Sequence, residues 1–131
     1  MSDAARWNGR GRFVIYASEH YATAMLEKTA QLNSIKIPRT LVYVRIALPP
    51  DVTVETLEAD GLAGWDDDNR AASRQYGNRW YDERRSLALV VPSLAAPGLE
   101  RNVLINQRHP EFTRVKASTP RPVSGQPRLL R

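Results

Sequence analysis

Three side chains near the start of the sequence can bind or polarise a substrate: Arg6, Tyr16 and Glu27, which lie ten and eleven residues apart. A guanidinium fork suits paired phosphate oxygens, a tyrosine ring can stack on a flat ring, and a carboxylate can stabilise developing positive charge. Each also has a simpler interpretation: a solvated loop arginine, a core tyrosine of a strand, and a glutamate on a polar helix face. The residue types permit a binding site without requiring one.

The elements that must position these side chains follow from local patterns. The run FVIYA at 13–17 is apolar, β-branched and aromatic, which predicts a buried strand. Ser18 is then expected to be the N-cap of a helix from Glu19 to about Leu32. The expected apolar stripe of this helix is Ala22, Met25, Leu26 and Leu32, and its opposite face is His20, Thr23, Glu27 and Gln31. Glu27 is therefore expected to point away from the packing surface of its own helix.

The rest of the chain predicts an α+β protein with few helices. Alternating residues predict a strand over 41–48, ended by Pro49 and Pro50, and 51–69 is expected to be an irregular connection anchored by Trp65. A helix is expected from an Asn69 cap to about Arg85, although Gly77 disfavours it. Further strands are expected at 87–91, 102–106 and 112–116, followed by an extended or mobile tail from Thr119. We expect one compact domain, residues 1–118, and a basic, proline-containing tail, residues 119–131, that packs on the domain or leaves it.

Composition excludes several classes of protein. With 131 residues the chain has room for a single core, and no apolar run approaches the ~20 residues needed to span a bilayer. The first residues lack the apolar stretch of a secretory signal, so a cytoplasmic location is expected. There are no cysteines, which excludes disulfides, thiolate zinc sites and a cysteine nucleophile.

The net charge of +5 does not by itself indicate a nucleic-acid-binding protein. Residues 1–100 hold 12 basic and 13 acidic side chains, whereas residues 101–131 hold 7 basic side chains and one acid, Glu111. This excess in the tail is typical of a solvated charged surface, and no helix-turn-helix pattern accompanies it. Direct nucleic-acid binding by the tail is retained only as a minor alternative.

Motifs for metals and redox dinucleotides are absent from the sequence. His20 and His109 are the only histidines, so no zinc set is predicted. The run 66–68, DDD, lacks the spacing and the glycine of a calcium loop. The run GRGRFV at 9–14 precedes a strand and lacks the third glycine of a Rossmann fingerprint, which excludes that domain.

A succession of short motifs carries a resemblance that periodicity does not supply. In order they are RWN, VIYAS, AMLEKTAQL, LVYVRIALP, GW, LALVVPS, NVLINQRHPEF and the final PRLL. In these motifs and their order the chain resembles the RES domain family, whose characterised members are toxins of bacterial toxin–antitoxin pairs.

The resemblance implies a split mixed β-core similar to that of the ADP-ribosyltransferases, with a cleft for NAD. NAD would be a substrate and not a redox cofactor, cleaved at its nicotinamide–ribose bond by hydrolysis or phosphorolysis. The alternatives are a toxin that ADP-ribosylates a protein and an inactive fold that only binds the antitoxin. The implied partner is an Xre-type antitoxin, in a homodimer or a toxin–antitoxin hetero-oligomer, with no membrane contact.

The resemblance also assigns roles to particular residues. Glu27 would stabilise the ribosyl cation, Arg6 would hold phosphate, and Tyr16 would pack on a ring or bond the ribose. Ser93 would be a hydrogen-bond donor that orients substrate, and not a nucleophile, since no histidine relay is visible. Asn106 and His109 match an NxxHP pattern; Asn106 is included among the NAD-binding candidates, although a structural role in the loop is preferred for both.

One departure from the family pattern concerns the start of the chain. Family members usually carry a further strand and an arginine before the RWN motif, where this sequence has only MSDAA. The expectation is that another part of the fold or a partner replaces this segment, or that the cleft lacks one wall and a sheet edge is exposed.

Overall fold

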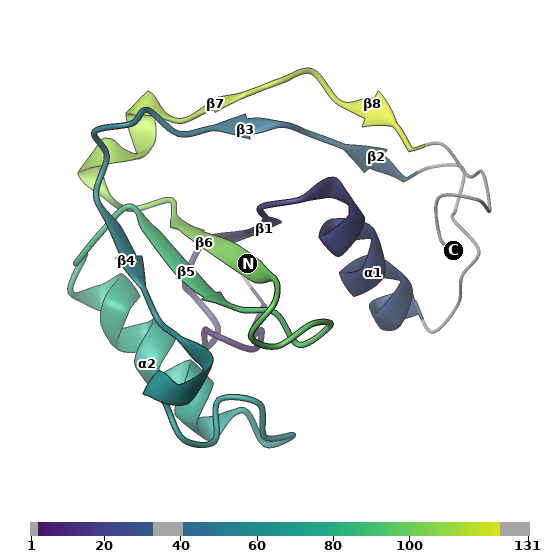
Figure 1. Ribbon diagram of the computed structural model, residues 1–131. Helices are drawn as coiled ribbons and strands as arrows, with labels where there is room; N and C mark the ends of the chain where they lie inside the picture. The colour runs from purple at the N-terminus through teal and green to yellow at the C-terminus, as the bar shows by residue number, and fades with distance from the viewer. Residues whose placement is uncertain (1–2, 33–40, 124–131) are drawn as a thin grey trace.

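The computed structural model describes residues 3–32 and 41–123 (Figure 1). The helices are α1 (Tyr21–Leu32), α2 (Ala71–Asp82), and the 3₁₀ turns η1 (Ala59–Gly61) and η2 (Pro110–Arg114). The strands are β1 (Val14–Ser18), β2 (Val42–Tyr43), β3 (Ile46–Ala47), β4 (Val54–Thr56), β5 (Ala88–Pro92), β6 (Arg101–Asn106), β7 (Lys116–Ala117) and β8 (Arg121–Pro122). None of the helices within these two ranges is long and apolar enough to cross a bilayer. The expected α+β class is confirmed.

The central sheet has four strands in the order β1-β6-β5-β4. β6 pairs antiparallel with both β1 and β5, and β4 pairs parallel with β5. The strands expected at 13–17, 87–91 and 102–106 are confirmed to within one residue. β4 lies inside the segment predicted to be irregular; with three residues it is too short to show an alternating pattern. β1 is an edge strand and is only half-buried, because the sheet ends beside it.

A two-stranded ribbon crosses over α1 and β1 in Figure 1. β2 pairs with β8 and β3 pairs with β7, both antiparallel. The single strand predicted over 41–48 is therefore wrong: Val44 and Arg45 interrupt it, and Val42 and Val44 are exposed. The described start of the tail belongs to the ribbon, since Arg121 pairs with Tyr43, and residues 124–131, including PRLL, lie outside the described part.

The strand predicted at 112–116 is also wrong, because η2 occupies most of that segment. Pro110 stands in the first turn, where its fixed φ suits a helix, and the His109 ring caps the turn by accepting a hydrogen bond from the Glu111 backbone N–H. The capping residues His109 and Pro110 therefore favour a 3₁₀ turn here, although the apolar residues after them are typical of a strand.

Two hydrophobic clusters cover the two faces of the central sheet. Neighbouring residues of a strand point to opposite faces, and Leu104 and Ile105 of β6 belong to different clusters. The Leu104 side packs against Trp80 of α2 and Trp7, and Trp7 stacks on Trp65 with ring centroids 6.2 Å apart. Trp65 is 5% exposed, which confirms it as an anchor.

Helix α2 contains a glycine because the N-terminal segment lies against it. A Cβ atom added to Gly77 would stand 1.7 Å from the Trp7 carbonyl oxygen. The helix begins two residues after Asn69 and ends three before the predicted Arg85; its N-cap is Arg70, in the left-handed region at φ 59°, and not Asn69. The Asn69 side chain instead accepts a hydrogen bond from the Ala71 N–H. Close approach of the two segments overrides the poor helix propensity of glycine.

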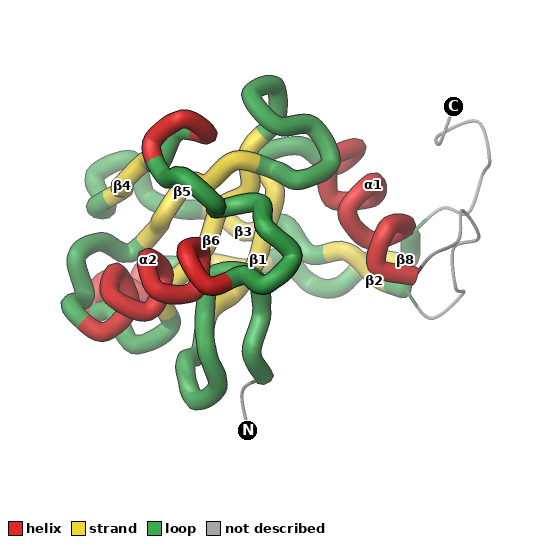
Figure 2. Tube along the Cα trace, turned by 90° about the horizontal axis from the view of Figure 1, so that it is seen from below, coloured by secondary structure: helices red, strands yellow, loops and turns green. Residues whose placement is uncertain are grey.

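Helix α1 begins later than predicted, and its buried face differs in part from the predicted one. Ser18 is the last residue of β1 and not a helix cap, because Glu19 continues the contact with β6 through two hydrogen bonds from the Arg101 guanidinium. In the helix Thr23 and Met25 are buried, while Ala22 and Leu26 are exposed. The predicted stripe is therefore wrong for Ala22 and Leu26; the side chains of Gln31 and Leu32 lie outside the described part. Helices α1 and α2 lie apart in both views of the fold (Figure 2).

Candidate functional site

The Glu27 carboxylate lies at the centre of a hydrogen-bond network that joins α1 to two strand ends. Its Oε1 accepts hydrogen bonds from Ser93 Oγ at 2.5 Å and from Asn102 Nδ2 at 3.2 Å, and a longer one from Ala95 N at 3.4 Å. The polar face of α1 thus points toward the sheet, contrary to the sequence prediction that Glu27 points away. The physical reason is that Ser93 and Asn102 supply polar partners for it there.

Ser93 holds this carboxylate from a fully buried position. It follows Pro92, the last residue of β5, and none of its surface is exposed. Its Oγ donates to Glu27 and accepts a hydrogen bond from the Ala95 N–H at 3.1 Å, which fixes the hydroxyl in the turn after the strand. Ser93 therefore donates to Glu27, and the predicted donation to substrate stays a prediction.

Asn102 is a site residue that the sequence analysis missed. Its Oδ1 accepts a hydrogen bond from Ser18 Oγ at 2.7 Å, so its Nδ2 is the atom left to donate to Glu27. Ser18 and Asn102 are paired directly across β1 and β6. The one signal in the sequence is an asparagine directly before the apolar run 103–105, where its amide must find polar partners.

A pocket of about 330 Å³ opens beside this network. Its lining consists of Tyr16, Ala17, Ser18, Ala24, Glu27, Lys28 and Asn102. Within the described residues the second carboxylate oxygen of Glu27, Oε2, accepts no hydrogen bond, whereas Oε1 accepts three. The network thus immobilises one oxygen of a pocket-lining carboxylate and leaves the other for a ligand. No group of three histidine, cysteine, aspartate or glutamate side chains able to hold a metal occurs in the described ranges.

Tyr16 contributes a ring to the pocket and keeps its hydroxyl out of it. The hydroxyl donates to Asn8 Oδ1 at 2.5 Å and accepts from the Trp7 N–H at 3.1 Å. Burial of the hydroxyl raises the pKa of Tyr16 to about 12. The residue as a whole is nevertheless 42% exposed, so the accessible part is the ring. Of the two predicted roles, this geometry favours packing on a ring over a hydrogen bond to a ribose.

Arg6 is not brought together with Glu27. Its Nη1 donates to the carbonyl oxygens of Trp65 and Asp67, at 3.1 and 3.0 Å, and Arg6 does not line the pocket. Burial and, next, the neighbouring Arg70 lower the pKa of the Arg6 guanidinium. What the structure assigns to Arg6 is the attachment of the 65–67 loop to the N-terminal segment; its contact with phosphate stays a prediction.

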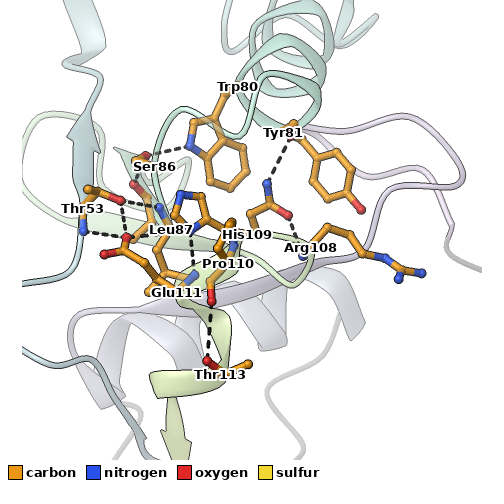
Figure 3. Close-up of polar contacts among 12 residues, drawn as sticks. Thr53, Trp80, Tyr81, Ser86, Leu87, Arg108, His109, Pro110, Glu111 and Thr113 are labelled. Atoms are coloured by element: carbon orange, nitrogen blue, oxygen red, sulfur yellow. Dashed lines mark hydrogen bonds and ion pairs between the residues drawn. The ribbon is translucent and has the colours of Figure 1, made fainter.

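Asn106 and His109 form hydrogen bonds that fix a loop away from this site. Asn106 is fully buried, donates from Nδ2 to the Tyr81 carbonyl and accepts at Oδ1 from the Arg108 N–H. It lies four residues beyond Asn102 on the same strand, about 13 Å at the usual rise. Figure 3 shows His109 and Glu111 in the same loop, where Glu111 accepts hydrogen bonds from Thr53. These contacts correspond to the structural role that the sequence analysis preferred for both residues.

Comparisons with known proteins agree on one family. The RES domain model matches residues 1–126. A protein of Sphingobium sp. named Prs ADP-ribosylating toxin is 35% identical over 130 residues, covering 96% of this chain and 80% of the relative. Two proteins named Toxin Res are 36% identical over 115 residues (Pseudomonas putida; 86% of this chain, 77% of the relative) and 29% identical over 126 residues (Yersinia enterocolitica; 95% and 82%).

Proposed function

Because the chain belongs to the RES domain family, we propose that it is the toxin of a bacterial toxin–antitoxin pair and cleaves the nicotinamide–ribose bond of NAD. In that reaction the bond between C1′ of the ribose and the ring nitrogen breaks, and nicotinamide leaves with both electrons as a neutral base. The ribosyl group is left with oxocarbenium character and is captured by water or phosphate, which releases a proton. The result is depletion of NAD.

The observation that carries this proposal is the asymmetric bonding of Glu27. An oxocarbenium-like transition state is stabilised by a fixed negative group close to the ribose, and a preorganised group needs no rearrangement as the charge develops. Ser93 and Asn102 hold Oε1 in place, so the orientation of the carboxylate is set before substrate binds. Oε2 then supplies the contact to the ribose.

The other pocket residues fit supporting roles. The exposed Tyr16 ring forms a wall of the pocket on which a flat nicotinamide ring can pack. Ser93 is a positioning residue that acts through Glu27, because it is fully buried and does not line the pocket. Ser18 acts at one further remove, by fixing the amide of Asn102.

Transfer of ADP-ribose to a protein side chain is a second candidate. The name of the Sphingobium relative, an ADP-ribosylating toxin, favours it. Both reactions share the cleavage step at Glu27 and differ in the group that captures the ribosyl carbon.

The toxin names of the relatives also support an antitoxin partner. We propose a cytoplasmic complex with an Xre-type antitoxin that covers the pocket. Such a complex would keep Glu27 from NAD until the antitoxin is removed.

The experiment that tests the proposed reaction is nicotinamide release from NAD by the purified protein, followed by chromatography with and without phosphate. Release without phosphate indicates hydrolysis, and release that requires phosphate indicates phosphorolysis. Release that requires an added cell extract, with ADP-ribose found on a protein, indicates transfer. No release under any of these conditions from folded protein would overturn the proposed activity and favour an inactive antitoxin-binding fold.

A further inference from the structure

The described lining of the pocket beside Glu27 includes one cationic side chain, Lys28, and not Arg6, the predicted one. Among the residues that the structure describes, Glu27 and Lys28 are the only charged ones in its lining. Arg6, the residue expected to hold phosphate, donates its Nη1 hydrogen bonds to two carbonyl oxygens outside the pocket. Among the described residues, Lys28 is therefore the cation available to a phosphate group in this pocket.

Lys28 is unpaired among the described residues. It forms no ion pair within residues 3–32 and 41–123. The helix positions three and four residues away hold Ala24, Met25, Gln31 and Leu32, none of which is acidic. Lys28 is half-buried and lines the pocket. An anionic group of a ligand bound in the pocket would give the Lys28 ammonium a counter-ion.

The helix sets the order of the two charged groups. Consecutive helical residues are about 100° apart around the axis, so Glu27 and Lys28 reach the pocket from adjacent directions. In a nicotinamide nucleotide the reacting C1′ and the 5′-phosphate lie on two sides of one ribose. A carboxylate at C1′ and an ammonium at the 5′-phosphate match that separation of positive and negative charge. The long, flexible stem of a lysine suits a point contact to a phosphate.

We propose that Lys28 binds the 5′-phosphate adjacent to the reacting ribose. This contact makes the pocket selective for phosphorylated nicotinamide nucleotides over nicotinamide riboside, which has no phosphate. This inference rests on the proposed function. Arg70 and Arg74 are not alternative candidates for the phosphate contact, because neither lines the pocket. Arg74 Nε donates a hydrogen bond to the Ala5 carbonyl instead.

The test compares nicotinamide release from NAD and from nicotinamide riboside by wild type, Lys28→Gln, Lys28→Arg and Lys116→Gln. Lys116 is an exposed lysine of β7, so its variant is a matched control for loss of one positive charge. We expect Lys28→Gln to raise KM for NAD about tenfold to a hundredfold, with kcat within about threefold, since a charged hydrogen bond to substrate is lost. Release from nicotinamide riboside should be unchanged, and Lys28→Arg should restore most of the NAD affinity.

Two outcomes would overturn the role of Lys28 while leaving the proposed function intact. Equal losses on both substrates would show that Lys28 supports the fold of the pocket, and an unchanged KM for NAD would show that phosphate binds elsewhere. If wild type releases nicotinamide from neither substrate, the proposed function fails. Calorimetric titration with ADP-ribose then tests whether Lys28 still binds a phosphate group. Weaker binding by Lys28→Gln than by wild type and Lys116→Gln would support the anion site, and equal or absent binding in all three would overturn it.

Discussion

The Ser93 hydroxyl donates a 2.5 Å hydrogen bond to Glu27 Oε1, across a sequence separation of 66 residues. The bond joins the end of a core strand to the face of a helix at the edge of the sheet. It has a consequence for α1: the face that carries Thr23 and Glu27 is turned inward, and the apolar Leu26 is left 50% exposed. The helix thus buries Met25 together with the polar Thr23, and polar contacts as well as apolar packing set its orientation.

Glu27→Gln should lower nicotinamide release by roughly 100-fold to 1,000-fold, the range for loss of one preorganised electrostatic group. The amide oxygen can still accept from Ser93 and Asn102, so the melting temperature should change little. Glu83→Gln is the matched control, since Glu83 lies at the exposed end of α2 and its carboxylate contacts only Arg85 at 3.4 Å among the described residues. Equal activities of the two variants would remove Glu27 from the mechanism.

Asn102→Asp should reduce activity more than Asn102→Ala. The aspartate keeps the shape of the side chain but replaces the Nδ2 donor, 3.2 Å from Glu27 Oε1, by an anionic oxygen. Two carboxylates this close cannot both stay ionised, so the negative charge that we propose to stabilise the ribosyl cation is reduced. We expect losses of about 100-fold for aspartate and about tenfold for alanine in kcat/KM, with circular dichroism unchanged. Equal losses would indicate that Asn102 acts only by packing.

The strands of the core could be predicted because burial leaves a local pattern. The apolar runs around Leu89 and Leu104 are continuous, as strands covered on both faces require, and both were located to within one residue. The family resemblance, carried by motifs and not by periodicity, supplied Glu27 and Ser93 as candidates. Their direct contact is a finding of the structure.

The orientation of α1 could not be predicted because its cause is distant in the sequence. Ala22 and Leu26 look like packing residues when the helix is considered alone. The partners of Glu27 are Ser93, just after β5, and Asn102 in β6, which lie 66 and 75 residues away in the sequence. For the same reason Asn102 was missed: a single asparagine gives no local indication of which carboxylate it will meet. The short strands of the ribbon, two residues each, are below the length at which alternation can be recognised.

Gly77→Ala should destabilise the protein, although alanine is the better helix former. Helix propensity alone predicts a gain of about 1 kcal/mol. The new Cβ would stand 1.7 Å from the Trp7 carbonyl oxygen, so the N-terminal segment must move away from α2 and from the stacked Trp65. We expect a net loss of about 3 kcal/mol in the free energy of unfolding, measured by urea denaturation.

Gly9→Ala is the control for this substitution. The Cβ added at Gly9 meets its nearest neighbour, Arg12 Nη1, at 3.4 Å, an ordinary contact, and the Gly9 N–H can still donate to Asn78 Oδ1. Its free energy of unfolding should stay within about 1 kcal/mol of wild type. A stable Gly77→Ala protein would show that the N-terminal segment does not pack on α2 in solution.

Tyr16→Phe should cost stability at neutral pH, and that cost should disappear at high pH. Removing the hydroxyl leaves Asn8 Oδ1 and the Trp7 N–H without their partner, which costs about 1–3 kcal/mol. The folded-state pKa of about 12 lies above the value near 10 of an unfolded chain, so the native state keeps a proton that the unfolded state loses. The stabilisation is therefore complete below about pH 10 and is lost as the pH rises toward 12. Urea denaturation at pH 6, 8 and 11 checks this: the difference between wild type and variant should be equal at pH 6 and 8 and smaller at pH 11.

Activity measurements on two variants distinguish the structural role of the Tyr16 hydroxyl from the binding role of its ring. Tyr16→Phe keeps the ring that lines the pocket, so nicotinamide release at pH 8 should stay within a few-fold of wild type once folding is verified. Tyr16→Ala removes the ring and should raise KM for NAD by about tenfold, since an aromatic contact and its buried area are lost together. If Phe instead loses as much activity as Ala, the hydroxyl must leave Asn8 and contact the substrate during turnover, and ring packing would no longer account for Tyr16.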